Sequence, residues 1–307
     1  MEKVLIATQK PFSKQAVEEI RSILAPEGYG LETLEKYGSE EELCDAVTDA
    51  VALIVRSDKV TAKVLEAARE LKIVVRAGAG YDNLDLAACT AHGVIAMNTP
   101  GQNSNAVAEL ALALMVFMSR NQFNPGTGRE LKGRTLGLQA YGHVGRLVAG
   151  IARGFGMKVQ AFDPYLTTEQ IESDGTKAVS SMDELYSTSD FVSLHIPATP
   201  ETKGSIGYAL ISKMPKGATL VNTARKEIIN EEELEKVLAE REDLKYVADV
   251  APANYATLRE KFGLRVFATP KKMGAETAEA NENAGTAAAR QIVGFLKHGE
   301  TRFQVNR

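Results

Sequence analysis

The sequence TLGLQAYGHVGRLVAGIARGFGMKVQAFD, from Thr135 to Asp163, decides the fold of this chain. It starts with a short apolar segment, Thr135–Leu138, and a turn that contains glycine. Apolar residues at helical spacing follow from about Val144 to Phe155, and a second apolar segment, Lys158–Phe162, ends on the acid Asp163. This order of strand, turn, helix, strand and acid predicts a βαβ unit that binds a dinucleotide.

The turn in this unit carries two of the glycines that the dinucleotide fingerprint requires. Gly142 would let the backbone approach a pyrophosphate, and Gly145 would let the helix pack closely on the strand. The N-terminus of the helix adds free N–H groups and a positive dipole end. Asp163 is spaced to accept hydrogen bonds from both ribose hydroxyls. Ala140 stands where the first glycine is expected, and a plain crossover with a tight turn is the alternative interpretation.

Length and composition indicate an ordinary globular protein. The chain has 307 residues, enough for two domains with separate cores, and is 44% hydrophobic and 25% charged. A net charge of -4 gives no general attraction to nucleic acid or anionic lipid, so neither is expected as a partner. The apolar runs are too short for a signal peptide or a membrane span. Cys44 and Cys89 have neither disulfide nor metal-site spacing, so we expect a cytoplasmic chain without a metal.

Short β segments alternate with amphipathic helical segments, which predicts parallel, doubly wound sheets. In the first domain we expect strands at Val4–Ala7, Val51–Val55, Ile73–Val75 and Val94–Met97, and helices at Ser13–Leu24, Thr61–Ala68 and Leu84–Ala91. After a break at Thr99–Gly101 comes an almost wholly apolar helix, Asn105–Met118. Such a helix has to be buried, in a domain junction or a subunit interface.

The second domain contains the dinucleotide unit, and its strand count matches a Rossmann sheet. We expect its six strands at Leu136–Leu138, Val159–Phe162, Phe191–His195, Thr219–Asn222, Tyr246–Asp249 and Val266–Ala268. A last helix, Glu276–Leu296, is too long for a simple crossover. We expect it to cross back and complete the first domain.

Basic groups follow two strands of the first domain. Arg56, Ser57 and Lys59 lie in VRSDKVT, and Arg76 precedes the turn Gly78–Ala79–Gly80 in VVRAGAGYDN. Because parallel strands end at one edge of the sheet, these groups predict a pocket for an anionic ligand. The glycine turn could point N–H groups at a carboxylate. A solvated, charged rim is the alternative.

Strand ends of the second domain carry further candidates for chemistry. Arg225, in VNTARKEII, can hold a carboxylate by two parallel hydrogen bonds. Asp249 could accept from the carboxamide of a nicotinamide. Lys271 and Lys272, in ATPKKMGAE, follow a proline turn, and a lysine near an arginine and away from carboxylates releases its proton more readily. His195, at a strand end, is interpreted as a structural residue.

The sequence resembles the D-isomer-specific 2-hydroxyacid dehydrogenases over essentially its whole length. The segments that carry the resemblance are VRSDKVT, VVRAGAGYDNLDL, MNTPGQNSNAVAELALALM, TLGLQAYGHVGR, HIPATPETKG, LVNTARKEII and ADVAPA. VRSDKVT and RAGAGYDN favour the phosphoglycerate dehydrogenases within the family, in the short form without C-terminal regulatory domains.

The resemblance implies NAD-dependent oxidation of 3-phospho-D-glycerate to 3-phosphohydroxypyruvate, the first step of serine biosynthesis. It also implies two doubly wound α/β domains. A Rossmann NAD domain would span residues 98–279, and a smaller, flavodoxin-like substrate domain would combine residues 1–97 with residues 280–307. The helix Asn105–Met118 resembles the dimerisation region of the family, so a homodimer is expected.

Site residues follow from the same resemblance, with Arg225 as the substrate arginine and Asp163 as the ribose acid. The negative charge of Asp163 favours NAD over NADP. The expected cofactor-binding residues are Ala140, Gly142, His143, Val144, Gly145, Asp163, Pro197, Thr223, Ala224 and Asp249. The expected substrate-binding residues are Arg56, Ser57, Lys59, Arg76, Gly78, Ala79 and Gly80, and the phosphate would be met by the first three.

Two positions depart from the family pattern. Lys271 or Lys272, depending on how the segment is aligned, replaces the catalytic histidine, and Asn254 replaces the glutamate that orients it. The two changes are consistent, because a carboxylate would hold a proton on the lysine. Another D-2-hydroxy acid, such as hydroxypyruvate or glyoxylate, is the alternative substrate class. A non-catalytic, NAD-sensing protein is the alternative from another class.

Overall fold

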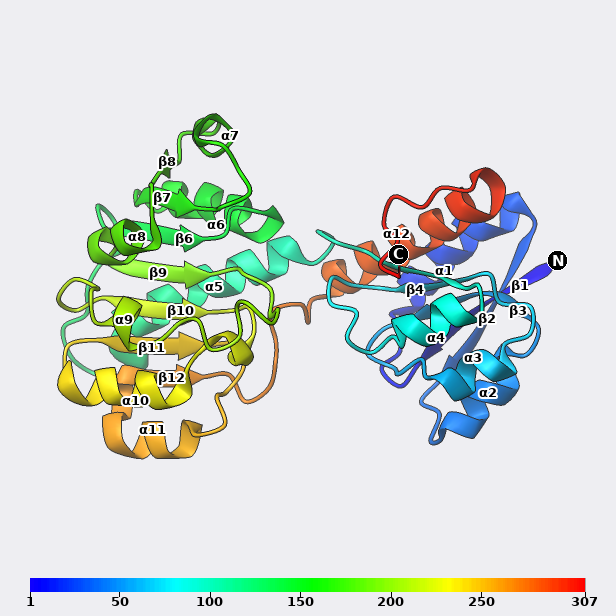
Figure 1. The fold of residues 1–307 in the computed structure, drawn as a ribbon, viewed down its shortest axis with the longest axis horizontal. Coiled ribbons are helices and arrows are strands. Elements are labelled where there is room, and N and C mark those ends of the chain that lie inside the picture. The colour runs from blue at the N-terminus through cyan, green and yellow to red at the C-terminus, as the bar shows by residue number, and fades with distance from the viewer. Residues whose placement is uncertain (307) are drawn as a thin grey trace. The chain divides into compact units, whose positions relative to one another are not determined.

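A computed structural model describes residues 1–306 as two compact units. Unit 1 contains Met1–Asn103 and the final segment from Glu276, and unit 2 contains Ser104–Ala275. The boundaries expected near residues 97 and 280 thus lie at 103 and 276 in the structure. Each unit has one parallel sheet with helices on both faces (Figure 1). The expected fold class, with two parallel-sheet α/β domains, is confirmed.

Unit 1 has a sheet with the strand order β2-β1-β3-β4-β5, which is the flavodoxin-like order. Its strands are β1 (Glu2–Thr8), β2 (Tyr29–Glu35), β3 (Ala50–Val55), β4 (Ile73–Arg76) and β5 (Ile95–Asn98). Its helices are α1 (Lys14–Leu24), α2 (Glu40–Val47), α3 (Ala62–Ala67), α4 (Leu86–Ala91) and α12 (Ala278–His298). The pair β2 and α2 was not predicted, because β2 is an edge strand that is fully buried only at Tyr29 and Leu31.

Two hydrophobic cores cover the faces of this sheet. One lies under α2, α3 and α4, and the other lies under α1 and α12. Helix α12 gives the second core Ala284, Ala288, Ala289 and Ile292. A Cβ at Gly285 would lie 2.9 Å from the Cδ1 atom of Ile20, so glycine lets α12 approach α1 closely. The last helix of the chain is therefore part of the core of the first unit.

Unit 2 has a seven-stranded sheet with the order β12-β11-β10-β9-β6-β7-β8. Its strands are β6 (Thr135–Gln139), β7 (Lys158–Phe162), β8 (Lys177–Ala178), β9 (Phe191–Leu194), β10 (Thr219–Asn222), β11 (Lys245–Ala248) and β12 (Val266–Ala268). Its helices are α5 (Ser104–Ser119), α6 (His143–Gly154), α7 (Thr168–Glu172), α8 (Met182–Thr188), α9 (Tyr208–Ile211), α10 (Glu231–Glu240) and α11 (Tyr255–Phe262). The expected count of six strands is wrong because β8, with two residues, is too short to show a pattern.

The apolar helix expected at Asn105–Met118 is α5, and half of its 16 residues are buried. Leu112, Met115 and Met118 contribute to the same core as α6. Leu110, Val116 and Phe117 are half-buried. No helix within residues 1–306 is both long enough and apolar enough to cross a membrane.

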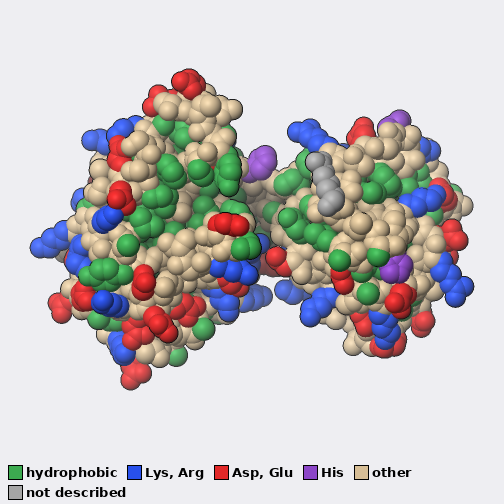
Figure 2. All heavy atoms as spheres, in the orientation of Figure 1, with side chains coloured by type: hydrophobic (Ala, Val, Ile, Leu, Met, Phe, Trp, Pro, Cys, Tyr) green, Lys and Arg blue, Asp and Glu red, His purple; other side chains and the backbone are tan. Residues whose placement is uncertain are grey.

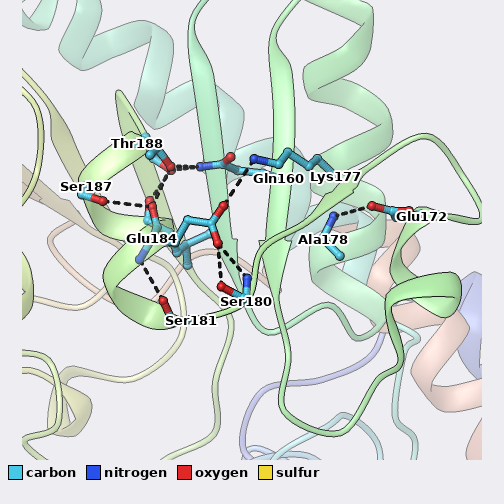
Figure 3. Close-up of polar contacts among 11 residues, drawn as sticks. Gln160, Glu172, Lys177, Ala178, Ser180, Ser181, Glu184, Ser187 and Thr188 are labelled. Carbon is cyan, nitrogen blue, oxygen red and sulfur yellow. Dashed lines mark hydrogen bonds and ion pairs between the residues drawn. The ribbon is translucent and has the colours of Figure 1, made fainter.

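Helix α8 lies very close to the sheet because β6 has a glycine beneath it. A Cβ at Gly137 would lie 2.2 Å from Ser189 Oγ and 3.0 Å from Leu185 Cδ1. The buried Gln160 of β7 donates to Thr188 Oγ1 (2.6 Å), as Figure 3 shows. It also donates to Ser189 Oγ (3.0 Å), and the two bonds fix the end of the helix over the strands. The carboxylate of Glu184 accepts from the N–H and hydroxyl of Ser180 (2.9 Å each), which fixes its start.

We expect Gly137→Ala to lower the free energy of unfolding by about 1–3 kcal/mol, because the new methyl group has to displace α8 from β6. Gly150→Ala is the matched control, since Gly150 lies inside α6 with nothing within 4 Å of its Cβ position. That variant should gain about 0.5–1 kcal/mol from helix propensity. Urea denaturation of both variants measures the contrast. A Gly137→Ala protein as stable as the wild type would contradict the close packing.

Candidate functional site

Six strands of unit 2 end in register, and the residues that follow them form one row along the carboxyl edge of the sheet. The last paired residues of this register are Phe162, Gln139, Leu194, Asn222, Ala248 and Ala268. The residues that follow directly are Asp163, Ala140, His195, Thr223, Asp249 and Thr269. The strand order reverses between β6 and β9, and ligands of doubly wound sheets bind at such a point. A ligand of unit 2 is therefore expected along this row.

The turn after β6 is bound to the end of β7. The Ala140 N–H donates to the carbonyl of Phe162 (2.9 Å), and the Tyr141 N–H donates to Asp163 Oδ2 (2.8 Å). The other carboxylate oxygen of Asp163 accepts from the N–H of Tyr165 (2.9 Å). These contacts hold the half-buried acid beside the turn, and each oxygen keeps a lone pair for a ligand hydroxyl.

The glycines of this turn have the geometry that a dinucleotide requires. Gly142 is the N-cap of α6, and a Cβ there would meet no atom within 4 Å. A Cβ at Gly145 would lie 2.5 Å from the carbonyl oxygen of Ala140. Gly142 thus leaves open space at the N-terminus of a helix, and Gly145 allows the helix to pack against the turn. Both properties fit a pyrophosphate at this position.

Ala140 adopts the conformation of the glycine that it replaces. Its φ is 74°, in the left-handed region, where an L-residue with a Cβ is disfavoured by about 1–2 kcal/mol. The turn therefore keeps the shape of the fingerprint in spite of the alanine. The cost of the alanine is therefore backbone strain.

His195, which was predicted to end a strand, directly follows β9 and lies next to the turn. Its N–H donates to the carbonyl of Gln139 (3.0 Å). The ring Nε2 is buried without a hydrogen-bond partner among residues 1–306. Burial lowers the pKa of His195 to about 4, so the imidazole is neutral at neutral pH. Pro197, two residues further along, is exposed.

The segment after β10 presents Arg225 from a tight turn. The side chain of Asn222 makes this turn: Oδ1 accepts from the N–H of Ala224 (3.0 Å), and Nδ2 donates to the carbonyl of Arg225 (2.8 Å). The half-buried guanidinium donates to the carbonyl of Ala224 (3.0 Å) and forms no ion pair with another of residues 1–306. Thr223 Oγ1 is buried, and within the same residues it has no hydrogen-bond partner.

Asp249 holds the loop that carries Lys271 and Lys272. The carboxylate is 1% exposed and accepts from Thr269 Oγ1 (3.1 Å) and from two main-chain N–H groups, those of Met273 and Gly274 (2.8 Å each). Thr269 Oγ1 also lies 2.8 Å from the carbonyl oxygen of Lys271. Both lysine residues are exposed on this fixed loop.

Gly274 allows the loop with the two lysines to approach the carboxylate of Asp249. A Cβ at Gly274 would lie 2.8 Å from Asp249 Oδ2 and 3.3 Å from Val107 Cγ2 of α5. The loop is thus pressed between the strand end and the first turns of α5. Asp249, which was expected to meet a nicotinamide carboxamide, uses most of its accepting capacity on this loop.

Asn254, at the position of the usual glutamate, contacts α10. Its N–H donates to Glu231 Oε2 (3.2 Å), and its Nδ2 lies 3.4 Å from both the Glu231 carbonyl and Glu235 Oε2. Glu235 is also paired with Lys261 (2.5 Å). These contacts join the start of α11 to α10.

In unit 1, Arg56 follows β3 next to the end of β1, where the order of this sheet reverses. Its guanidinium donates to the carbonyl of Lys10 (2.9 Å) and to Asn281 Oδ1, and lies 5.4 Å from the ring centroid of Phe12. Burial lowers the pKa of this guanidinium. Arg56 therefore ties α12 to the loop after β1, while Ser57 and Lys59 are exposed.

The predicted glycine turn packs against Arg76. Arg76 Nε donates to the carbonyl of Arg56 (3.0 Å), and a Cβ at Gly78 would lie 1.4 Å from Arg76 Nη1. Gly78 has a φ of 143°, which also favours glycine. The N–H of Gly78 donates to Thr99 Oγ1 (2.6 Å), so only Ala79 and Gly80 of this turn keep N–H groups for a ligand. Unit 1 thus brings Arg56, Arg76 and the turn together.

Three residues that shape these sites were not predicted from the sequence. Tyr141 joins the turn to Asp163, Thr269 holds the lysine loop, and Asn281 accepts from Arg56. A threonine before a proline at a strand end was a weak signal for Thr269. For Asn281 there was none, because its partner lies far away in the sequence. Within residues 1–306, no group of histidine, cysteine and acidic side chains is arranged to hold a metal ion.

The buried imidazole of His195 should make the protein less stable in acid. The unfolded chain takes up the proton near pH 6.5 and the folded chain only near pH 4, so stability is lost as pH falls through this window. The full effect is about 3 kcal/mol. In urea denaturation from pH 7.5 to 4.5, His195→Gln should flatten this fall. The exposed His298→Gln is the control, and equal pH dependence in both variants would contradict the assignment.

Comparison with known proteins agrees with this geometry. Residues 108–273 match the family described as D-isomer specific 2-hydroxyacid dehydrogenase, NAD binding domain. The structure of an NAD⁺-bound 3-phosphoglycerate dehydrogenase of Entamoeba histolytica is similar, with a TM-score of 0.89 and 48% identity, over 100% of this chain and 99% of the other.

Curated relatives with two different activities are also similar. A D-3-phosphoglycerate dehydrogenase of Methanocaldococcus jannaschii is 38% identical over 84% of this chain and 52% of its own length. The chain thus spans about half the length of curated phosphoglycerate dehydrogenases that it matches. A hydroxypyruvate reductase of Thermotoga maritima is 38% identical over 85% of this chain and 90% of its own length. The chain belongs to the D-isomer specific 2-hydroxyacid dehydrogenase family.

Proposed function

We propose that this chain is an NAD-dependent dehydrogenase that oxidises 3-phospho-D-glycerate to 3-phosphohydroxypyruvate, the first step of serine biosynthesis. The observation that carries the proposal is Arg225, a half-buried guanidinium without an ion pair among residues 1–306. It lies on the same sheet edge as the dinucleotide turn and the lysine loop. The similarity to phosphoglycerate dehydrogenases along the whole chain supports the choice of substrate.

NAD would bind along the row of strand ends in unit 2. Gly142 and the N-terminus of α6 would receive the pyrophosphate, with His143, Val144 and Gly145 in the same turn. Asp163 would accept from the ribose hydroxyls, and its charge would repel the 2′-phosphate of NADP. Thr223 Oγ1, a buried hydroxyl without a partner among residues 1–306, is available to the nicotinamide half together with Ala224 and Pro197.

Arg225 would hold the substrate carboxylate by two parallel hydrogen bonds and keep the adjacent hydroxyl in place. A lysine of the loop fixed by Asp249 would take the hydroxyl proton as the carbonyl forms. Bound NAD would supply the acceptor for the hydrogen that leaves carbon with its electron pair. Asp249 would act mainly as the residue that keeps the lysine in position, because its carboxylate binds the loop backbone.

The phosphate would be met by the basic cluster at the strand ends of unit 1. Ser57 and Lys59 are exposed and can bond it directly. Arg56 would contribute charge more than new hydrogen bonds, since its guanidinium already binds Lys10 and Asn281. Arg76 and the N–H groups of Ala79 and Gly80 complete the proposed substrate-binding set.

The purified protein should reduce NAD in the presence of 3-phospho-D-glycerate, as read by the absorbance of the reduced cofactor. D-glycerate should be a much poorer substrate, because it lacks the group that meets the basic cluster. One of the two variants Lys271→Ala and Lys272→Ala should lose about a hundredfold or more in kcat, and the other should serve as its matched control.

Different outcomes would identify the alternatives. Equal turnover of D-glycerate and its phosphate would favour another D-2-hydroxy acid, a possibility that the similarity to the Thermotoga maritima protein keeps open. NAD binding without turnover of any 2-hydroxy acid would favour a non-catalytic, NAD-sensing protein. Full activity in both lysine variants would remove the lysine loop from the proposed mechanism.

We also propose that the protein is a homodimer through the region around Asn105–Met118, extended by the turn that follows it. Phe123 is 70% exposed and packs edge-on against Phe117, with 5.2 Å between ring centroids. The turn Asn121–Phe123 has φ values of 52°, 57° and 57°. Three successive left-handed residues are costly, and such strain is typical of segments with a function.

Sedimentation velocity should give the mass of two chains for the wild type. Phe123→Ser should shift the protein toward a single chain, because it removes the exposed apolar anchor. Tyr165→Ser is the matched control, since Tyr165 is 92% exposed and lies after β7 instead of α5. A dimer that is unaffected by Phe123→Ser, or dissociated equally by both variants, would contradict the proposed interface.

A further inference from the structure

We propose that Tyr141 is a positioning residue for the dinucleotide, which takes over the role of the missing glycine by holding Ala140 in its left-handed conformation. The inference rests on the proposed binding of NAD at this turn. The phenol hydroxyl of Tyr141 would then control cofactor affinity without touching the cofactor.

Ala140 needs an external constraint. A glycine adopts a φ of 74° without strain, whereas alanine prefers to leave this region. If Ala140 relaxed, its carbonyl oxygen would move away from Gly145 and the Tyr141 N–H would turn away from Asp163. Both changes would occur at the points where the pyrophosphate and the ribose are expected to bind. With alanine, the turn can persist only if several contacts with neighbouring residues hold it in place.

The side chain of Tyr141 anchors the turn from one side. It is 0% exposed, and its hydroxyl donates to Asp174 Oδ2 (2.6 Å) and lies 2.6 Å from Thr176 Oγ1. Arg153 of α6 completes this network: it donates to Thr176 Oγ1 (2.8 Å) and lies 3.6 Å from Asp174. The phenol is therefore attached both to the loop before β8 and, through Arg153, to α6.

The backbone and the ring of Tyr141 anchor the turn from the other side. The N–H donates to Asp163 Oδ2 (2.8 Å), and the guanidinium of Arg146 lies 4.7 Å from the ring centroid. Arg146 in turn donates to the carbonyl of Gln170 (3.3 Å). One residue thus links the ribose acid, the first turn of α6 and the loop before β8. A shift of Tyr141 would displace both cofactor contacts together.

The ionisation of this network agrees with the same role. Burial raises the pKa of Tyr141, so its hydroxyl remains protonated and can donate to Asp174 throughout the neutral range. The hydrogen bond from Tyr141 lowers the pKa of Asp174, against the effect of burial. The anchor is therefore a charge-assisted hydrogen bond, which is stronger than a neutral one.

A buried tyrosine could instead serve only stability, and the chain offers a control for that alternative. Tyr186 is also 0% exposed, and its hydroxyl donates to Gln139 Oε1 (2.8 Å), one residue before Ala140. It belongs to α8 and does not hold the turn itself. Removal of the Tyr186 hydroxyl leaves the buried Gln139 Oε1 without this donor, but only removal of the Tyr141 hydroxyl should release Ala140.

The experiment is a double-mutant cycle on the full chain, with NAD affinity measured by titration calorimetry and stability by thermal unfolding. Tyr141→Phe should weaken NAD binding about tenfold, the effect of one buried hydrogen bond. The KM for 3-phospho-D-glycerate should stay unchanged at saturating NAD. Ala140→Gly/Tyr141→Phe should restore NAD affinity to within about twofold of Ala140→Gly alone, because glycine needs no constraint. Tyr186→Phe should lose stability but keep the affinity for NAD.

Unchanged NAD affinity in Tyr141→Phe would overturn the proposal, and so would an equal loss with glycine at position 140. If Tyr141→Phe alone does not fold, the comparison of Ala140→Gly/Tyr141→Phe with Ala140→Gly decides. Weaker NAD binding by the double variant would then also overturn the proposal. If the wild type binds no NAD, the proposed function fails instead. The thermal cycle still tests the role of Tyr141, because Ala140→Gly should then reduce the loss of stability that Tyr141→Phe causes.

Discussion

The parallel pairing of β6 with β7 on one side and with β9 on the other is the constraint on which unit 2 depends. Gln139 pairs with both Phe162 and Leu194, so the chain leaves β6 between the ends of two other strands. The next residue has to turn within a crowded edge, which is why its backbone is left-handed. The same register brings the residues after β7, β9, β10 and β11 into one row, and so all proposed cofactor contacts follow from it.

Aspartates at strand ends fix the loops of both units by accepting main-chain N–H groups. Asp163 holds the turn at Tyr141, Asp249 holds Met273 and Gly274, and in unit 1 Asp58 accepts from Gln9 (2.7 Å). These N–H groups satisfy oxygen atoms of the carboxylates. Each of these loops is therefore held by a carboxylate at a strand end.

Local patterns predicted the dinucleotide unit and most strand ends, because strand, turn and helix periodicities are short-range properties. The structure confirms the strand, turn and helix order of Thr135–Asp163. The sequence could not reveal the two residues of β8 or the partner of Arg56, since Asn281 is distant along the chain and contacts follow only from packing. It identified Ala140 as a departure, but only φ/ψ values show that the alanine keeps the conformation of glycine.

The discontinuous first unit has a consequence for biosynthesis. Ala284, Ala288 and Ile292 of α12 cover one of its two cores, yet they are translated after the whole of unit 2. Unit 2 is contiguous from Ser104 to Ala275 and can bury its core while the chain is still on the ribosome. The apolar side chains on the face of the first sheet beneath α12 stay uncovered until α12 has been synthesised. Unit 2 can therefore complete its core before unit 1, and until then the uncovered face of the first sheet is exposed to chaperones and to aggregation.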